Sequence, residues 1–468
     1  MIDLSRAGAV AQPDGEGRAG GGRCNDRVRF TLGLVGDRLE QVRFGADACA
    51  ATTAAAAWLA ARAEGGQLLD AARLGLAEVL AGAAIEPAGA ECALTAVDAF
   101  HAAIGDAVAR GAVVSSDPNR VVVAMSGGVD SAMVLTQTVA EGHEAVGVTL
   151  RLWIDPEAPS PERACCAPSA VRAARDLCHQ SGMPHIALDL RDDFRATVVD
   201  PFVAGYAAGE TPNPCTTCNG AFRFDAIDRV VQRLGAATWR TGHYVQLVVQ
   251  AGTPLVARGV DATKDQSYML ALVDPEILTR VQFPLGARKK VDVQHEAAEQ
   301  GLAAANALES QEVCFLGGGA LAPFLERQGV RMTPGPIVDE DGVELGTHAG
   351  ALAYTPGQRR GLGVSRGTEA LHVLRIDAPA NTVVVGTVGR LRRREVSLRD
   401  IQVRADVPRI DACFRMRAVP VAGRLEQGRD GTGTGTVYLD ADAHQIAPGQ
   451  VAALYDGERI VAAGIVAG

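Results

Sequence analysis

The stretch Ser126-Gly127-Gly128-Val129-Asp130-Ser131 decides the fold of the chain around it. It follows the apolar, β-prone segment Val121-Val122-Val123-Ala124-Met125, and the apolar segment Ala132-Met133-Val134-Leu135 comes directly after it. This order predicts a buried strand, a tight glycine turn and the first turn of a helix. Backbone N–H groups at such a turn, together with the positive end of the helix dipole, can hold phosphate. The missing lysine and the different spacing exclude a Walker loop.

The stretch resembles the pyrophosphate-binding loop (PP-loop) of N-type ATP pyrophosphatases, which adenylate a carbonyl oxygen and release pyrophosphate. The resemblance implies that ATP is bound by the loop, by Leu150 at the end of the second strand and by Gly242 at a later strand end. The loop positions are Ala124, Met125, Ser126, Gly127, Gly128, Val129, Asp130 and Ser131. Strand and helix patterns continue to alternate after the loop, which predicts a doubly wound α/β domain over residues 120–322.

Bulk composition limits the class of protein. A length of 468 residues suggests about three domains, and the net charge of −10 is unusual for a nucleic-acid binder, so RNA would need a local basic patch. We find no signal-like N-terminus and no run of about 18 apolar residues, so we expect a cytoplasmic protein without a membrane partner. In that compartment the ten cysteines indicate metal or sulfur chemistry and not a disulfide framework.

The first part of the chain predicts a small α+β domain. We expect residues 1–22 to be disordered because glycine, alanine and polar residues dominate them. Alternating residues between Val28 and Phe44 predict a β-hairpin. Helical patterns follow over residues 50–63, 68–81 and 91–109. The domain is expected over residues 23–112, with a linker at 113–119.

Within this domain, Cys24-Asn25-Asp26, the turn ending at Cys49, and Cys92 at the start of a helix resemble the NifU/IscU/SufU iron–sulfur scaffold fold. The resemblance implies that Cys24, Asp26, Cys49 and Cys92 gather at one end of the domain. There they would bind Zn²⁺ or a nascent Fe–S cluster, or accept persulfide sulfur from a cysteine desulfurase. Thiolates suit both metals, and a helix N-terminus lowers a thiol pKa. The alternative is a small domain with buried structural thiols.

The rest of the chain contains Cys215-Thr216-Thr217-Cys218-Asn219 after a proline-rich loop. A Cys-x-x-Cys pair by itself could be half of a zinc ribbon. Together with the PP-loop and further ordered motifs it resembles the MnmA-type tRNA 2-thiouridylase, from about residue 120 to the C-terminus. These motifs are Thr241–Tyr244, Lys264–Tyr268, Phe283–Gly286, Ser310–Phe315 and Tyr354–Gly363.

The resemblance implies roles for the cysteines. Cys218 would be the nucleophile and Cys314 the carrier of a persulfide. ATP would adenylate the C2 oxygen of the wobble uridine, with Mg²⁺ neutralising the pyrophosphate, and Cys314 would deliver sulfur to C2. Cys218 would free the sulfur or resolve the intermediate as a disulfide with Cys314. Cys215 leaves an alternative open, because the three thiolates could instead hold an Fe–S cluster.

The resemblance also implies contacts with the anticodon arm of tRNA, by a central domain at residues 323–390 and a C-terminal β-barrel at 391–468. Residues 388–417 hold nine arginines and four acids, a basic patch suited to RNA. The alternative interpretation of these residues is a solvent-exposed strand face that does not bind RNA. Cys165-Cys166 could be a functional or an incidental pair, and Cys178 is expected to be a buried small hydrophobe. The expected tRNA contacts are His243, Lys264, Asp265, Gln266, Arg359, Arg360 and Gln450.

The sequence therefore predicts an ATP-dependent tRNA-uridine 2-sulfurtransferase with a fused sulfur or Fe–S donor domain. A cysteine desulfurase or another sulfur donor is its expected partner. Two alternatives remain at this point: an Fe–S carrier with a degenerate ATP domain, and another PP-loop adenylating ligase.

Overall fold

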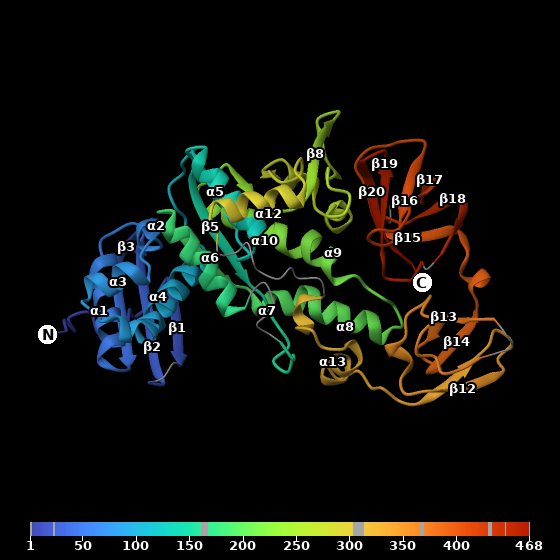
Figure 1. Ribbon diagram of the computed structural model, residues 1–468, viewed down its shortest axis with the longest axis horizontal. Coiled ribbons are helices and arrows are strands. Elements are labelled where there is room, and N and C mark those ends of the chain that lie inside the picture. The colour runs from blue at the N-terminus through green and yellow to red at the C-terminus, as the bar shows by residue number, and fades with distance from the viewer. Residues whose placement is uncertain are drawn as a thin grey trace.

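The computed structural model arranges the chain as a row of units along its longest axis (Figure 1). The N-terminal domain lies at one end, the doubly wound domain follows it, and a small middle domain and a barrel lie at the other end. The predicted multidomain fold class is thereby confirmed. The structure describes residues 2–21, 24–160, 167–302, 313–365, 369–428, 433–444 and 446–467.

The N-terminal domain packs a three-stranded antiparallel sheet, in the order β1-β2-β3, against a long buried helix, α4. The predicted helix over residues 68–81 is wrong in one respect, because the chain breaks it into α2 and α3 between Ala72 and Gly75. The elements are β1 (Gly15–Gly21), β2 (Asp26–Val35), β3 (Arg38–Asp47), α1 (Ala50–Ala63), α2 (Leu68–Ala71), α3 (Leu76–Gly82), η1 (Pro87–Gly89) and α4 (Ala90–Arg110).

The expectation of disorder over residues 1–22 is also wrong. Residues 15–21 form β1, which pairs antiparallel with β2 along its whole length. The glycines that suggested disorder serve close packing: a Cβ on Gly15 would lie 2.4 Å from the carbonyl oxygen of Ala103, and one on Gly17 would lie 2.1 Å from the Ala103 nitrogen. Here glycine lets a strand approach the backbone of α4.

The second domain contains a parallel sheet in the order β10-β7-β4-β5-β6. Val122 and Val123 of β4 are both fully buried and join different apolar clusters, because neighbouring side chains of a strand point to opposite faces. Its elements are β4 (Arg120–Ala124), α5 (Val129–Ala140), β5 (Glu144–Arg151), α6 (Pro168–Gln180), β6 (His185–Asp189), α7 (Arg191–Phe194), η3 (Arg195–Val199), α8 (Asp200–Ala207), α9 (Pro214–Cys218), η4 (Asn219–Arg223), α10 (Phe224–Arg233), β7 (Thr238–Arg240), β8 (Val245–Gln250), β9 (Thr253–Arg258), η5 (Ser267–Leu270), α11 (Pro275–Leu278), β10 (Val281–Gln282), α12 (Lys290–Glu299) and η7 (Cys314–Leu316).

The middle domain is a four-stranded sheet in the order β12-β11-β14-β13, and the C-terminal barrel closes through pairing of β15 with β20. A feature that the sequence analysis missed is that the hairpin β8–β9 extends the barrel sheet, because Ala257 pairs with Arg459 of β20. The elements are α13 (Leu321–Arg327), β11 (Gly335–Val338), β12 (Glu344–His348), η8 (Ala351–Ala353), β13 (Leu371–Asp377), β14 (Thr382–Thr387), η9 (Val388–Leu391), β15 (Arg393–Val403), β16 (Ile410–Cys413), β17 (Val421–Gln427), β18 (Gly435–Ala443), β19 (Val451–Asp456) and β20 (Arg459–Val466).

One stretch in the described part of the chain, Pro87–Arg110, is long and apolar enough to cross a membrane by composition. Within its most apolar window, 67% is buried inside the protein. The stretch is the core helix of the N-terminal domain and its lead-in turn, and its apolar character is explained by that burial.

Helix α4 also forms the junction between the first two domains, because it packs on the edge strand β6 of the parallel sheet. The approach is close: a Cβ on Gly105 would lie 2.0 Å from the carbonyl oxygen of Ala187. Glycine at this position therefore allows the helix backbone to touch the strand backbone.

We expect Gly105→Ala to destabilise the junction by about 2 kcal/mol, because an added methyl group overpacks a contact made by two backbones. The substitution Gly45→Ala is the matched control, since nothing lies within 4 Å of a Cβ built there. Urea denaturation of both variants checks this expectation. Equal midpoints for the two variants would contradict the close packing.

Candidate active site and metal centre

The PP-loop connects β4 to α5, as the strand–turn–helix pattern predicts. Gly127 has a φ of +77°, which an L-residue rarely adopts, and a Cβ there would lie 2.7 Å from the carbonyl oxygen of Ala170. The hydroxyl of Ser131 donates to the carbonyl oxygen of Gly128 at 2.9 Å and lies 3.3 Å from the Ser126 hydroxyl. The two serines thus lie against each other at the N-terminus of α5, where free amides and the helix dipole favour an anion.

A lysine that the sequence analysis did not single out holds this loop. Lys290, the first residue of α12, places its Nζ 2.7 Å from each carboxylate oxygen of Asp130. The Tyr244 hydroxyl donates to the same carboxylate at 2.8 Å. The Lys290 side chain is only 6% exposed. Three separate elements therefore meet at Asp130. The sequence feature that could have pointed to Lys290 is its position four residues after the Phe283–Gly286 motif.

The other predicted nucleotide contacts lie around the loop. Gly242 approaches it so closely that a Cβ would lie 2.9 Å from the Asp130 Cβ. Leu150 lies at the carboxyl end of β5, beside the strand that leads into the loop, and is largely buried. Ligands of doubly wound sheets bind at this edge.

The catalytic cysteines predicted for sulfur transfer lie on two segments. Asn213 caps α9 by accepting hydrogen bonds from the backbone N–H groups of Cys215 and Thr216 at 3.1 and 3.3 Å. Cys218 at the end of α9 is buried, whereas Cys215 and Cys314 are half-buried.

The two cysteine segments pack against one aromatic ring. The Phe194 ring centroid lies 5.5 Å from that of Phe222, one helical turn beyond Cys218, and 6.1 Å from that of Phe315, which follows Cys314. Within the described residues, one group of three or more potential metal-binding side chains has its ligand atoms within 4.8 Å of one another, and this group is in the N-terminal domain. Cys215, Cys218 and Cys314 are not members of that group, and their persulfide or disulfide role and their Fe–S cluster role both stay predictions. Residues 303–312 and the pair Cys165-Cys166 lie outside the described residues.

Cys178 is buried in an apolar cluster, as predicted. His243 packs against Phe224 and Phe283, and its Nδ1 lies 2.9 Å from the Thr241 hydroxyl. Burial, assisted by the charge of Arg223, lowers the pKa of His243 to about 3. Any contact of this imidazole with RNA would therefore be a neutral hydrogen bond and not an ion pair.

Several residues predicted to contact tRNA are engaged within the chain. The Asp265 carboxylate accepts hydrogen bonds from the Ser267 hydroxyl at 2.8 Å and from its backbone N–H at 3.1 Å. The Gln266 side-chain oxygen accepts from the Tyr244 N–H at 2.8 Å. Gln450 donates to the carbonyl oxygen of Thr211 at 2.5 Å. The contact of Gln450 with Thr211 joins the barrel to the PP-loop domain.

The basic patch is smaller than its sequence suggests. Arg399 pairs with Glu210 at 2.9 Å, and Arg404 donates to two backbone carbonyl groups of residues 271 and 273, so both are half-buried structural residues. Arg359 and Arg360 of the middle domain are exposed. The exposed arginines of residues 388–417 are Arg390, Arg392, Arg393, Arg394, Arg409, Arg415 and Arg417.

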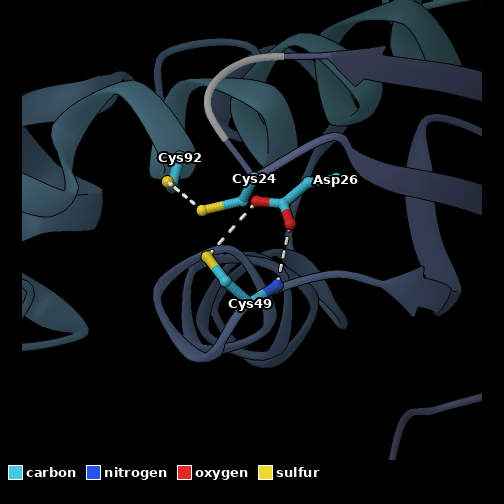
Figure 2. A group of neighbouring side chains, drawn as sticks. All are labelled: Cys24, Asp26, Cys49 and Cys92. Carbon is cyan, nitrogen blue, oxygen red and sulfur yellow. Dashed lines mark hydrogen bonds between the residues drawn. The ribbon is translucent and has the colours of Figure 1, made fainter.

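The N-terminal domain brings Cys24, Asp26, Cys49 and Cys92 together, with one potential ligand atom of each within 4.8 Å of the others (Figure 2). Cys24 lies in the turn before β2, and Asp26 is the first residue of β2. Cys49 is the N-cap of α1, and Cys92 lies in the first turn of α4. The Cys24 and Cys92 sulfurs are 3.7 Å apart. Asp26 accepts the Cys49 backbone N–H at 2.8 Å.

A threonine that the sequence analysis missed supports this cluster. The Thr52 hydroxyl lies 2.5 Å from a carboxylate oxygen of Asp26 and 2.9 Å from the carbonyl oxygen of Cys92. Burial raises the pKa of Cys49, but hydrogen bonds from Thr52 outweigh it and leave that pKa lowered. The sequence feature that could have pointed to Thr52 is a polar residue one helical turn after Cys49 in a helix made mostly of alanines.

The expected lowering of a thiol pKa at the start of α4 is wrong for Cys92. Hydrogen bonds from Cys24 and Cys49 raise the pKa of Cys92 to about 12, because the neighbouring thiols disfavour another negative charge. A donor set of three sulfurs and one carboxylate nevertheless fits Zn²⁺ or iron, since a cation removes that repulsion. Cys24 is exposed, so the centre opens to solvent.

Comparison with known proteins identifies the class of enzyme. The NifU-like N terminal domain family matches residues 4–112, and the tRNA methyl transferase HUP domain family matches residues 119–318. The tRNA methyl transferase PRC-barrel domain family matches residues 322–387, and the Aminomethyltransferase beta-barrel domain family matches residues 394–466. This combination of families is that of a tRNA-modifying PP-loop enzyme with an N-terminal domain that is similar to an iron–sulfur scaffold.

Individual relatives narrow this class. The "Bifunctional protein NifU/MnmA" of Rubrobacter xylanophilus is 40% identical over 488 aligned positions, covering 100% of this chain and 97% of that protein. The "tRNA-specific 2-thiouridylase MnmA" of Sorangium cellulosum is 40% identical and covers 77% of this chain and 95% of that protein. The chain belongs to the MnmA-type tRNA 2-thiouridylase family, in the form that carries an N-terminal NifU-like domain.

We expect Lys290→Met to raise the KM for ATP by about tenfold, which corresponds to ~1.4 kcal/mol, because it leaves the Asp130 carboxylate without its ammonium partner and frees the loop. Lys289→Met is the matched control, since Lys289 is exposed beside it. ATP–pyrophosphate exchange measures both variants. An unchanged KM in Lys290→Met would show that the ion pair does not position the loop.

We expect Zn²⁺ affinity of the N-terminal centre to rise with pH. The raised pKa keeps Cys92 protonated at neutral pH, so metal binding must displace its proton, and affinity gains about tenfold per pH unit for each proton released. Calorimetry in two buffers of different ionisation enthalpy counts these protons. Cys413→Ala, in the barrel, should bind Zn²⁺ normally. Binding that is independent of pH would contradict the role of Cys92.

Proposed function

We propose that the protein catalyses ATP-dependent 2-thiolation of the wobble uridine of tRNA in the cytoplasm. The observation that carries this proposal is that the segments bearing Cys218 and Cys314 pack on one ring, Phe194, within the domain that holds the PP-loop. A loop for pyrophosphate and a thiol pair in one domain suit an adenylation followed by a sulfur transfer.

The first half-reaction activates the base. The C2 oxygen of uridine attacks the α-phosphorus of ATP, and pyrophosphate leaves with the electron pair of the broken P–O bond. Ser126, Ser131 and the amides at the start of α5 would bind the departing pyrophosphate. Mg²⁺, bound to the phosphates, would neutralise their charge. The pair of Asp130 and Lys290 keeps the loop in place.

The second half-reaction replaces the oxygen. The terminal sulfur of a Cys314 persulfide attacks C2, and AMP leaves with the former C2 oxygen. The Cys218 thiolate then attacks the Cys314 sulfur, which forms a Cys218–Cys314 disulfide and leaves the electron pair of the old S–S bond on the uridine sulfur. A dithiol reductant restores both thiols. The half-buried setting of Cys314 limits loss of its persulfide to water.

The tRNA would lie across the exposed arginines of the barrel and the middle domain, whose charges suit phosphate. Arg359 and Arg360 are proposed contacts. His243, Lys264, Asp265, Gln266 and Gln450 remain proposed direct contacts, and Gln450 also joins the barrel to the PP-loop domain. The wobble base must leave its stack to reach the thiols.

The N-terminal centre would supply sulfur. A cysteine desulfurase would load a persulfide on one of its thiols, with Cys49 the favoured acceptor because its pKa is lowered. Zn²⁺ or an Fe–S cluster bound by Cys24, Asp26, Cys49 and Cys92 would stabilise the unloaded centre. The proposed partners are thus tRNA and a desulfurase.

Mass spectrometry of nucleosides tests this function with purified protein, tRNA, ATP and Mg²⁺. Cys218→Ser and Cys314→Ser should each lower 2-thiouridine formation by more than about 100-fold with any sulfur source, because each removes an atom that bonds sulfur. Cys215→Ala is the matched control and should retain most activity. Activity lost in Cys215→Ala, together with bound iron in the wild type, would replace the persulfide mechanism by a cluster mechanism.

A further inference from the structure

The N-terminal domain is fixed to the catalytic domain by a network of polar contacts. Asp98 of α4 pairs with Arg175 of α6 at 2.8 Å, and the Arg175 side chain is 4% exposed. Arg73 pairs with Glu144 of β5 at 3.0 Å. The His185 N–H donates to the carbonyl oxygen of residue 72 at 3.2 Å. Together with the backbone contact at Gly105, these interactions form a specific interface between the N-terminal domain and the catalytic domain.

The segment between the two domains is not a free tether. The Val114 N–H donates to the carbonyl oxygen of Arg233 at 2.7 Å, and the Asp117 N–H donates to that of Gly235 at 2.9 Å. The Ser115 hydroxyl donates to the Asp37 carboxylate at 2.6 Å. Each end of the predicted linker is thus bound to a folded element. A flexible linker would raise the local concentration of the donor thiols, but a bound one cannot move them.

The two sulfur centres lie at the far ends of two helices that meet at their C-terminal ends. Arg233, which ends α10, donates to the carbonyl oxygens of Val108 and Ala109 at 2.7 Å. Cys92 lies ~24 Å along α4 from that contact, at ~1.5 Å per residue. Cys218 lies ~22 Å away along the run of α9, η4 and α10, at the same rise. In Figure 1 the N-terminal domain occupies the left end, and α9 lies to the right of α10. The N-terminal domain, with its cysteines, and α9 thus lie on opposite sides of α10 (Figure 1).

We propose that sulfur from the N-terminal centre of one chain is delivered to Cys314 of a second copy of the chain. This inference rests on the proposed function. The exposed Cys24 shows that the donor centre faces solvent, where another molecule can reach it. In the step itself, the Cys314 thiolate attacks the terminal sulfur of a donor persulfide. One S–S bond breaks and one forms, and the donor cysteine leaves as a thiolate, so no external oxidant or reductant is needed.

Complementation between two full-length variants tests this proposal. Cys49→Ser removes the favoured donor thiol and Cys314→Ser removes the acceptor. The two are co-expressed with the same tag, purified as one pool and supplied with tRNA, ATP, a desulfurase and cysteine. The pool should reach about a quarter of the wild-type rate, because half of random pairs are mixed and each mixed pair keeps one donor facing one acceptor. A pool no more active than either variant alone would overturn the proposal.

Dilution of the wild-type protein tests the same point without a substitution. With desulfurase fixed and saturating, specific activity should fall on dilution. Activity supported by free sulfide should stay constant, because sulfide attacks the Cys314 sulfur of the Cys218–Cys314 disulfide, which forms the Cys314 persulfide and releases the Cys218 thiolate within one chain. Specific activity that is independent of dilution, together with a failed complementation, would place the transfer within one chain. Recovery when the two variants are separated by a dialysis membrane would also overturn the proposal, because a diffusible sulfur species would then be the carrier.

The controls separate this proposal from the proposed function. Ala50→Ser changes an exposed neighbour of Cys49 and should keep full activity with the desulfurase. Cys49→Ser alone should lose desulfurase-supported thiolation and keep sulfide-supported thiolation. If Cys49→Ser instead kept its desulfurase-supported activity, the donor role itself would fail. That failure of the donor role can be told apart from a failure of transfer between two chains, because it would be seen with the Cys49→Ser variant alone, before the two variants are combined.

Discussion

The catalytic end of the molecule depends on one ion pair, between the Asp130 carboxylate and the buried ammonium of Lys290. A buried lysine without a partner would lose its charge or destabilise the fold, so the carboxylate and the ammonium each require the other. The pair joins the phosphate loop to α12, and the Tyr244 hydroxyl adds the strand end that carries Gly242. The pair and the tyrosine therefore hold together three elements that carry residues expected to bind the nucleotide.

The same pair connects the nucleotide site to the tRNA-binding side. Tyr244 bonds through its backbone to Gln266, and the neighbouring Ser267 hydroxyl lies 3.0 Å from the hydroxyl of Tyr455 in the barrel. The Tyr268 hydroxyl donates to the carbonyl oxygen of Val451 at 2.9 Å. Residues of a motif that the sequence analysis associates with RNA thus also lie at the joint between the two domains.

Much of the fold could be predicted from sequence, because it follows from local patterns. The run Val121–Val123 predicts a strand buried on both faces, and the structure places its side chains in cores on both sides. Residues 15–21 were mispredicted because glycine content measures flexibility only when nothing packs on the glycines. Lys290 and Thr52 were missed because their partners, Asp130 and Asp26, are distant in sequence. The local pattern around each residue was visible, but a single sequence does not show which distant residues pair.

The hairpin β8–β9 has a consequence for how this enzyme can be divided. It belongs to the catalytic domain by chain order, yet Ala257 pairs with Arg459 of the barrel, and Arg258 stacks over the ring of Tyr455. A barrel expressed alone would leave the start of β20, at Arg459, without its pairing partner, and unpaired strand segments promote aggregation. Chimeras that exchange the barrel between relatives would therefore have to carry residues 245–258 with it, although more than a hundred residues of chain separate the two parts. The smallest exchangeable part of this protein is discontinuous in its gene.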